Sequence, residues 1–464
     1  MRVWSVVGLL MGIGGCGSSD LADEVDTASE PVVDGAAPPL RSWSGAEDCC
    51  GADPHPVHGA MLSDGSVVMV GKSAASGDRI AGFATRWVPQ SGPASGRFVD
   101  TDPGVIAASV AWPPGSAMVQ AVEADGAIVV VGFQTPSPGE KAVGIAVRLD
   151  PGTLAETGRI EIEGPERGTS AVLESVAVDA SGRIIMGGSW GLAVDAIEGL
   201  KSFGNIVDGR GIAIAVDPAA WNAAGAATTT PSALGAAVRE VPEVHSIKSL
   251  RTADAAIVAV GHDNEEVSGM VWMDSDLAEH RWTRFDDDYE LTDAALVRGS
   301  GGEITAILVG HGGPRTIDGH AKMVRSNGEV MWSASFGNPG LQPGDMPDAP
   351  LAPDAFIFDE CWGVAATPSG AVVGCGSGIE GCDAVDATAK ERQQCQTDPR
   401  RVWRSHVVGV SLEGAVQWSR TDAFVSEEGE AFESASEFVF TGPAGDLFSV
   451  VDHDFGVGLA RYGD

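Results

Sequence analysis

The chain has 464 residues, with 29 basic against 65 acidic side chains and a formal net charge of −36. A protein this acidic repels phosphate backbones, so nucleic-acid binding is not expected, and we interpret the charge as a solubility feature. Hydrophobic residues make up 44% of the chain, which is ample for a core.

The first residues have the layout of a secretory signal. Arg2 precedes an apolar run over residues 3–13, which is shorter than the roughly 20 residues that a membrane-spanning helix needs. The run ends in IGGC (13–16), which resembles the bacterial lipobox, the motif whose cysteine is acylated and becomes the mature N-terminus. The resemblance implies a signal peptide over residues 1–16 and a lipid anchor on Cys16. An ordinary cleaved signal peptide is the alternative.

The residues after Cys16 indicate a destination and a tether. In the lipoprotein sorting rule, an aspartate directly after the cysteine favours the inner membrane. This chain has Gly17 there, so we expect an outer-membrane lipoprotein on the periplasmic or the surface face. Residues 17–38 are acidic and poor in large apolar side chains, which predicts a flexible tether. The folded domain is expected over residues 39–464.

Six further cysteines suggest disulfides, because an even number in an exported chain is typical of cystine pairing. Cys361 and Cys375 flank an expected hairpin and could face each other, and Cys382 and Cys395 share one polar insertion. The adjacent pair Cys49 and Cys50 either bonds to itself or splits between two partners. Zinc is a weaker interpretation, since no Cys-x-x-Cys pair occurs.

One pattern recurs seven times from residue 58 onward: an alternating apolar strand, a turn with glycine or aspartate, and a second apolar strand. The copies span residues 58–72, 118–133, 174–189, 247–262, 294–311, 363–376 and 437–453. A second hairpin follows, most clearly over residues 269–285, 320–336 and 407–420. Short runs with a period of two are typical of strands, and no long stretch has helical periodicity. Seven four-stranded units predict an all-β chain, a seven-bladed β-propeller.

The repeat resembles the bacterial seven-bladed propeller repeat (SBBP-type). The likeness rests on an inner strand ending near Asp-x-x-Gly, a strand ending in glycine, and a Trp-Ser pair, as in WSASFG (332–337). It covers roughly residues 40–464 and is clearest in the last four copies; in the second copy, RIEIEG (159–164) stands where the tryptophan would be. The resemblance implies a propeller fold and says little about function.

The two ends of the chain predict how the ring closes. The seventh copy runs to residue 464 and stops where its fourth strand should begin, whereas LRSWS (40–44) looks like an isolated fourth strand. We therefore expect residues 40–44 to pair with the third strand of the last blade near Leu459, which leaves no free sheet edge at the join. The alternative is that Trp43 merely packs in a linker.

The copies are long for this fold, and loops at the mouth of a propeller are where binding usually resides. The largest insertions are residues 89–117, 189–211, 217–245, 335–360 and 376–404. Three copies place a histidine after the second strand, and these could ring one mouth with neighbouring side chains. The candidate metal or ligand residues are His262, His311, His453, Asp263, Asp454, His245 and His58. Surface histidines without a specific role are the alternative.

Other motifs in the sequence indicate no specific function. Residues 286–288 and 100–102 are acidic clusters but lack the spacing of a calcium loop, and solvated turns explain them better. No Gly-x-Ser-x-Gly elbow, His-Glu-x-x-His or Walker loop appears.

These observations favour a monomeric binding module for a protein or a glycan, held to the membrane by a lipid. The alternative is an extracytoplasmic enzyme with its site in the channel mouth, either a quinone-dependent dehydrogenase or a polysaccharide lyase or hydrolase. Cys49 and Cys50 are the feature that favours a quinoprotein, since a bonded adjacent pair packs on the quinone in some of them. The sequence specifies no cofactor or metal, and the third possibility is a scaffold in a larger envelope assembly.

Overall fold

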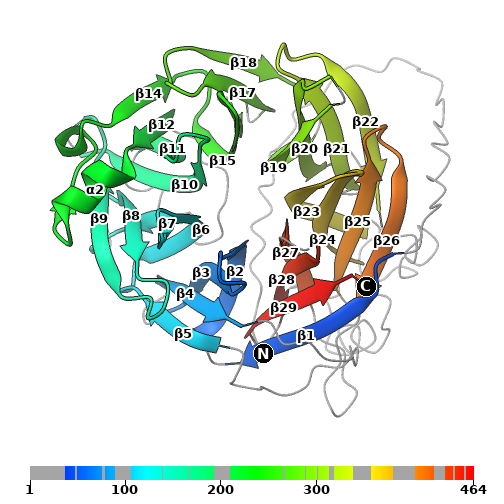
Figure 1. Cartoon of the computed structure of the whole chain (residues 1–464), viewed down its shortest axis with the longest axis horizontal. Helices are drawn as coiled ribbons and strands as arrows, with labels where there is room; N and C mark the ends of the chain where they lie inside the picture. Colours follow the sequence, from blue (N-terminus) through cyan, green and yellow to red (C-terminus); the bar gives the residue numbers. More distant parts are fainter. Residues whose placement is uncertain are drawn as a thin grey trace, which may run out of the picture.

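A computed structural model gives the protein seven small antiparallel sheets arranged in a ring, so the chain is a seven-bladed β-propeller (Figure 1). The structure describes residues 37–47, 50–75, 79–88, 106–137, 139–166, 168–192, 209–263, 265, 267–287, 289–299, 301–312, 318–337, 357–379, 403–422, 434–442, 445–453 and 456–463. Each predicted repeat copy forms the inner hairpin of one blade.

Among the first three blades, blade 2 has a fifth strand, and the connection between the last two strands of blade 3 contains a helix. Blade 1 is β2 (Ala52–Met61), β3 (Val67–Ala74), β4 (Ile80–Trp87) and β5 (Ile106–Ala111). Blade 2 is β6 (Ser116–Ala124), β7 (Ala127–Gln134), β8 (Val143–Leu149) and β9 (Glu156–Ile162), and it gains the short parallel strand β13 (Thr228–Thr229). Blade 3 is β10 (Ser170–Val178), β11 (Ile184–Leu192), β12 (Arg210–Val216) and β14 (Ala237–Val241).

Blades 4 to 6 each consist of four consecutive strands. Blade 4 is β15 (Ser246–Ala253), β16 (Ala256–His262), β17 (Ser268–Asp274) and β18 (His280–Arg284). Blade 5 is β19 (Tyr289–Arg298), β20 (Ile304–Gly312), β21 (Asp318–Arg325) and β22 (Val330–Phe336). Blade 6 is β23 (Ile357–Thr367), β24 (Gly370–Ile379), β25 (Arg404–Ser411) and β26 (Val416–Asp422).

Blade 7 closes the ring with strands from both ends of the chain. Its strands β27 (Ser434–Thr441), β28 (Leu447–His453) and β29 (Gly456–Tyr462) are completed by β1 (Leu40–Glu47). β1 pairs antiparallel with β29, so that Ser44 lies opposite Leu459. The predicted closure by the N-terminal strand is therefore confirmed, and Figure 1 shows β1 and β29 side by side.

The core lies between the blades, where the apolar faces of neighbouring sheets meet. One cluster joins blades 2 and 3 around Leu173 and Met186, and another joins blades 5 and 6 around Ile307 and Val373. At roughly 25 cal/mol per Å² of buried apolar area, this inter-blade packing is the main stabilising contribution, and it requires every blade to have two neighbours.

The insertion between β12 and β14 folds over blade 2. It contains helix α2 (Pro218–Ala224) and a 3₁₀ turn, η2 (Ser232–Leu234). Asp217 caps α2 by accepting a hydrogen bond from the Ala219 amide, and Trp221 is fully buried beside Gly158 of β9. The sequence did not predict this helix, because it is only 7 residues long, although Asp217 before Pro218 is a helix-start signal. No helix among the described residues is long and apolar enough to cross a membrane.

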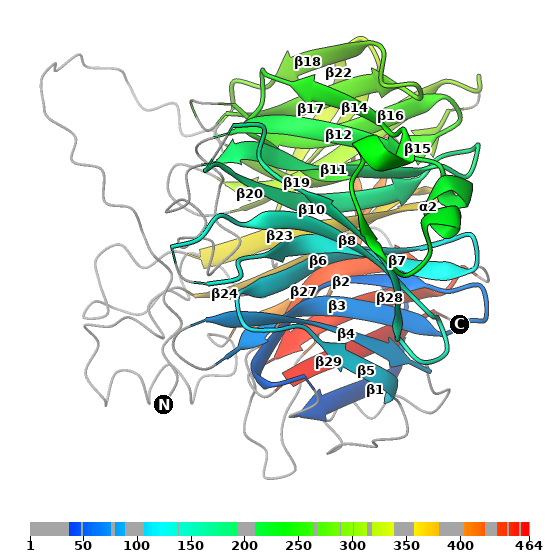
Figure 2. The ribbon, with the colours of Figure 1, turned by 90° about the vertical axis from the view of Figure 1, so that its left-hand side faces the viewer.

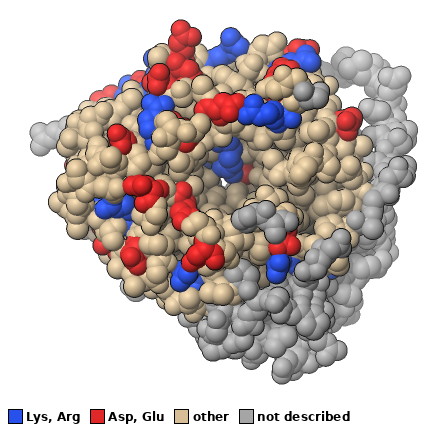
Figure 3. Space-filling model, in the orientation of Figure 1, with Lys and Arg blue, Asp and Glu red and all other residues tan. Residues whose placement is uncertain are grey.

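The central channel has two different mouths. We call mouth A the end where the inner strands begin and the second strands end, and mouth B the end that carries the inner-hairpin turns and α2. In Figure 2 mouth A faces left and mouth B, with α2, faces right. Figure 3 views the ring from the α2 side, where the surface is hollowed at the centre and basic side chains are visible inside the hollow.

Candidate functional site

Every inner strand carries a β-bulge near mouth A. The register against the second strand shifts by one residue at the same place in all seven blades, and the extra residues are Val57, Val119, Glu174, Lys248, Thr292, Trp362 and Glu437. A bulge bends the strand and re-aims a side chain, and bulges are frequent beside functional sites. The repetition places seven variable side chains at one level of the channel.

The last channel-side residue of each second strand forms a second ring close to the bulges. The strand register gives its members as Lys72, Phe133, Ser189, His262, His311, Gly376 and Asp452. Blades 1 and 2 contribute apolar bulge residues, Val57 and Val119, whereas the other blades contribute mostly polar or aromatic ones. Mouth A therefore has a polar arc that runs from blade 3 through blade 7 to Lys72 and His55 of blade 1.

At the junction of blades 7 and 1, a histidine lies between two carboxylates. His55 Nδ1 is 2.7 Å from Asp452 Oδ2, and its Nε2 is 3.9 Å from Glu437 Oε2. Burial acts to lower the pKa of His55, but the two carboxylates outweigh it and raise that pKa. Burial raises the pKa of Glu437 to about 7, and burial lowers the pKa of Lys72, which lies near both carboxylates, to about 8.

The opposite part of the arc is a row of ionisable side chains across blades 3 to 6, with one ion pair at its centre. Lys248 Nζ donates to Glu290 Oε1, and this cation lowers the pKa of Glu290 to about 2. Burial raises the pKa of Glu174 to about 7 on one side of Lys248, and burial also raises the pKa of Glu360 beside His311. Buried ionisable groups are costly, so a continuous arc of them is unusual in a core and typical of a binding site.

Blade 6 places two tryptophans at mouth A. Trp362, the bulge residue of β23, is half-buried, and its ring centroid lies 6.5 Å from that of Trp403, which is also half-buried and directly precedes β25. The indole of Trp403 lies against Gly376 and Gly378 of β24: a Cβ on Gly376 would come within 2.2 Å of Trp403 Nε1. Glycine at position 376 is therefore required for this placement.

A layer of polar side chains below the bulges ties neighbouring blades together. His58 Nε2 is 3.1 Å from Gln120 Nε2, and Gln120 Oε1 accepts from the Val176 amide of blade 3. Asp293 accepts from Arg251 of blade 4 and from the Val364 amide of blade 6. Apart from the buried His58 Nδ1, which has no hydrogen-bond partner among the described residues, these groups bond to one another across blade junctions, so we interpret this layer as structural.

The structure places the predicted site residues in different environments. His262 and His311 end their second strands at mouth A, and His245, just before β15, has its ring centroid 6.2 Å from that of His262. His58 belongs to the deeper layer, where burial lowers its pKa well below 6.5.

The remaining predicted residues lie away from the second-strand ring or outside the described chain. The register puts Asp452, and not His453, at the position of His262 and His311. Asp263 accepts from the Glu265 and Val267 amides and pairs with Arg284, as a turn residue does. Asp454 lies outside the described residues.

Among the predicted disulfide cysteines, Cys361 and Cys375 are bonded across β23 and β24, as predicted. Cys50 is also disulfide-bonded. Cys16, Cys49, Cys382 and Cys395 lie outside the described residues, so nothing more follows for the pairing of those cysteines or for the lipid anchor.

Sequence reasoning missed the residues that build most of the arc: His55, Glu174, Lys248, Glu290, Glu360, Trp362, Trp403, Glu437 and Asp452. The signal for four of them was present. A residue that interrupts the two-residue alternation at the same place in each inner strand marks the bulge, as Glu174, Lys248, Trp362 and Glu437 do. The other residues depend on which blades become neighbours, and no single repeat reveals that.

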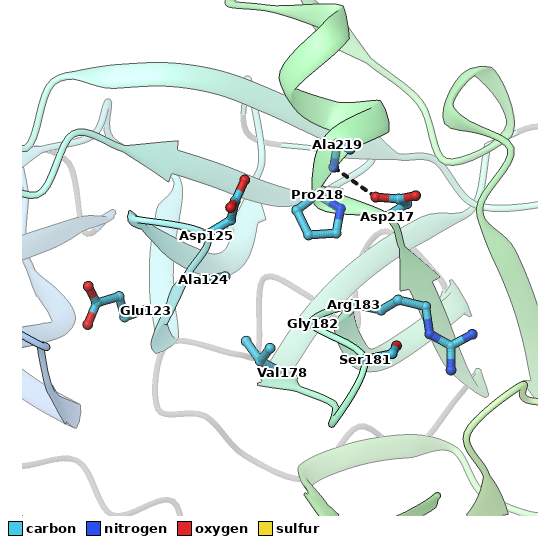
Figure 4. Close-up of a pocket in the computed structure, with 10 residues that line it drawn as sticks. All are labelled: Glu123, Ala124, Asp125, Val178, Ser181, Gly182, Arg183, Asp217, Pro218 and Ala219. Atoms are coloured by element: carbon cyan, nitrogen blue, oxygen red, sulfur yellow. Dashed lines mark hydrogen bonds between the residues drawn. The ribbon is translucent and has the colours of Figure 1, made fainter. Parts of the chain in front are cut away.

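Mouth B has a depression of about 560 Å³ beside α2, between blades 2 and 3. Figure 4 shows that it is lined by residues at and near the hairpin turns, among them Glu123, Asp125, Arg183 and Asp217. Arg183 is paired with Asp179 and Asp276. Asn222 of α2 donates to Asp125 across it. Its charged groups are largely paired and solvated, so mouth A is the stronger candidate site.

Comparisons with known proteins find only distant structural likenesses. No protein-family model matches the sequence, and no curated protein sequence matches it. An apocarotenoid oxygenase of Synechocystis matches with 12% identity over 61% of each chain and a TM-score of 0.34. A glucose dehydrogenase matches with 11% identity over 91% of this chain and 99% of its own, with a TM-score of 0.33. The matched part spans about three fifths of the oxygenase, and neither likeness is close enough to support a statement about activity.

Proposed function

We propose that the chain is an outer-membrane lipoprotein whose propeller is a rigid binding module for a glycan, bound at mouth A. The observation that supports the ligand class is the pair of half-buried tryptophans, Trp362 and Trp403, at the mouth that also carries Glu360 and Glu437. Aromatic faces pack against the C–H faces of sugar rings, and carboxylates and imidazoles accept hydrogen bonds from sugar hydroxyls. The SBBP-type resemblance and the IGGC motif support the repeat family and the envelope location.

The ring supplies the rigidity that such a site needs. Trp403 is held by Gly376 and Gly378, and Trp362 is held by the bulge next to the Cys361–Cys375 disulfide. Because both rings are positioned before a ligand arrives, little side-chain entropy is lost on binding. A protein partner is the alternative occupant of the same mouth.

Binding is tested by titrating the full chain, purified in detergent, with neutral and acidic oligosaccharides in a calorimeter. We expect Trp362→Ala and Trp403→Ala each to weaken binding at least about tenfold, since each removes one stacking surface. The matched control is Trp282→Phe on the outer strand β18, which should leave the affinity unchanged. Equal losses in all three variants, or no binding of any oligosaccharide, would contradict the proposal.

The anchor is tested separately by fractionation. Cys16→Ala should move the protein from the membrane pellet into the soluble fraction, because the acylated residue is removed. Retention of this variant in the pellet would rule out the lipid anchor while leaving glycan binding open.

A polysaccharide lyase or hydrolase is the second candidate. A carboxyl with a pKa of about 7 can both give and take a proton at neutral pH, and burial places Glu437 there. The assay is the appearance of new chain ends when the protein is mixed with a polysaccharide that it binds. Activity that disappears in Glu437→Gln with binding retained would favour the enzyme over the binding module.

A further inference from the structure

We propose that His55, Glu437 and Asp452 form a binding site for one divalent transition-metal ion at the junction of blades 7 and 1. The three residues come from three strands, β2, β27 and β28, and each offers one ligand atom within 4.8 Å of the others. Residues 55 and 437 lie almost at opposite ends of the folded chain, so ring closure itself assembles the site.

The carboxylate of Glu437 is buried and has few partners. Glu437 is 7% exposed and Asp452 is 6% exposed. Among the described residues, no hydrogen bond to the Glu437 carboxylate is found, and His55 Nε2 at 3.9 Å is its ion-pair partner. A buried carboxylate normally accepts hydrogen bonds or binds a metal, because an uncompensated charge is costly away from water.

The donor set indicates the class of metal. One imidazole nitrogen and two carboxylate oxygens suit zinc, cobalt, manganese or ferrous iron, whereas calcium requires six to eight oxygens. Three protein ligands leave a coordination position for water or a ligand, as in sites that act on ligands. With bonds of about 2.0 to 2.2 Å, two ligand atoms on one ion lie roughly 3 to 3.5 Å apart. His55 Nε2 and Glu437 Oε2, which are 3.9 Å apart here, would draw closer, whereas His55 Nδ1 and Asp452 Oδ2, which are 2.7 Å apart, would have to separate before both could bind the ion.

Lys72 supplies a positive charge beside the two carboxylates when no metal is bound, and the same charge would oppose metal binding. Its ammonium interacts favourably with both carboxylates. A cation bound between His55 and the carboxylates would be repelled by Lys72, so removing this charge should strengthen metal binding. An ion-pair network built around Lys72 without any metal function predicts no such gain.

Another blade junction supplies the matched control. At the junction of blades 5 and 6, His311 and Glu360 again bring a histidine near a carboxylate, and Glu290 is close to both. His311 Nδ1, however, is 3.1 Å from the carbonyl oxygen of Cys361, and Glu290 is paired with Lys248. We therefore expect metal binding at the first junction and none at the second.

The test is calorimetric titration of the metal-stripped full chain with Zn²⁺, followed by the absorption spectrum with Co²⁺. We expect one ion per chain, about 100-fold weaker binding in His55→Ala and Glu437→Gln, and about threefold tighter binding in Lys72→Met. His311→Ala should bind as tightly as the unchanged chain. Glutamine has nearly the same shape as glutamate, so we expect Glu437→Gln to melt like the unchanged chain, which would show that weaker metal binding is not caused by misfolding.

Two results would overturn the inference. One is the absence of stoichiometric Zn²⁺ and Co²⁺ binding by the folded, unchanged chain. The other is equal metal affinity in Glu437→Gln and His311→Ala. The test measures the metal alone, so its outcome is independent of whether mouth A binds a glycan.

Discussion

The junction between blades 7 and 1 and the junction between blades 5 and 6 use the same residue types in opposite places. In the first, the inner strand supplies His55 and the second strand supplies Asp452; in the second, the inner strand supplies Glu360 and the second strand supplies His311. His55 lies between two carboxylates, whereas the backbone of Cys361 engages His311. The same residue types therefore give different arrangements, and the local hydrogen bonds decide which histidine pairs directly with a carboxylate.

The two junctions also differ in what holds their blades together. Blade 7 depends on β1, which comes from the other end of the folded chain, while blade 6 carries the Cys361–Cys375 disulfide across its inner hairpin. Among the described residues, the ring closes at blade 7 through strand pairing, whereas blade 6 is reinforced covalently.

The largest effect is expected from deleting residues 39–47. This removes the fourth strand of blade 7 and exposes the edge of β29, so the melting temperature should fall by at least about 10 °C. The measurement is a thermal melt followed by circular dichroism, with deletion of residues 17–30 as the control. A melt like that of the control would mean that β1 contributes little to closure.

Replacing Cys361 and Cys375 by alanine should weaken blade 6 by about 3 kcal/mol, because a disulfide across a loop of this size constrains the unfolded chain. Urea unfolding should show this loss in the double variant and at least as large a loss in the reduced unchanged chain, because reduction also opens the disulfide of Cys50. A loss confined to the double variant would point to a packing defect at these buried positions and not to the bond.

Acid should destabilise blade 6 through His406, which lies opposite Cys375 on β25. Burial lowers the pKa of His406 to about 4 in the folded chain, against about 6.5 when unfolded. Above pH 6.5 both states are neutral; as the pH falls from 6.5 to 4, only the unfolded state takes up the proton, so folding loses up to about 3 kcal/mol.

The comparison that isolates His406 is unfolding at pH 7 and pH 4.5 in the unchanged chain and in His406→Asn. The variant should lose less stability between the two pH values by about 2 to 3 kcal/mol. An identical pH dependence in both proteins would show that His406 does not titrate in this range.

The smallest effect on stability is expected from Gly376→Ser. The new Cβ would displace the Trp403 indole, at a cost of about 1 kcal/mol, while glycan binding should fall nearly as far as in Trp403→Ala. Gly301→Ser, at a turn where an added Cβ meets no atom within 4 Å and φ is not positive, controls for substitution of a glycine as such. Full glycan affinity in Gly376→Ser would show that glycan binding does not depend on where the Trp403 indole lies.

The blades could be predicted from the sequence, whereas most residues of the candidate site could not. Alternation of period two and glycine turns specify each hairpin locally, and LRSWS together with the truncated last copy predicted closure near Leu459, where Ser44 pairs. The polar arc at mouth A was not predictable in the same way, because Glu437 meets His55 only when the ring closes and blade 1 lies beside blade 7. Helix α2 was missed because its short amphipathic signal is weak against the surrounding strands.

The most direct test of the proposed site is ¹⁹F NMR of the full chain labelled with 5-fluorotryptophan, titrated with an oligosaccharide that binds in the calorimeter. The account predicts that the resonances of Trp362 and Trp403, assigned by substitution, shift with the binding isotherm while that of Trp282 stays fixed. Shifts confined to tryptophans outside mouth A would place the binding site elsewhere and contradict the account.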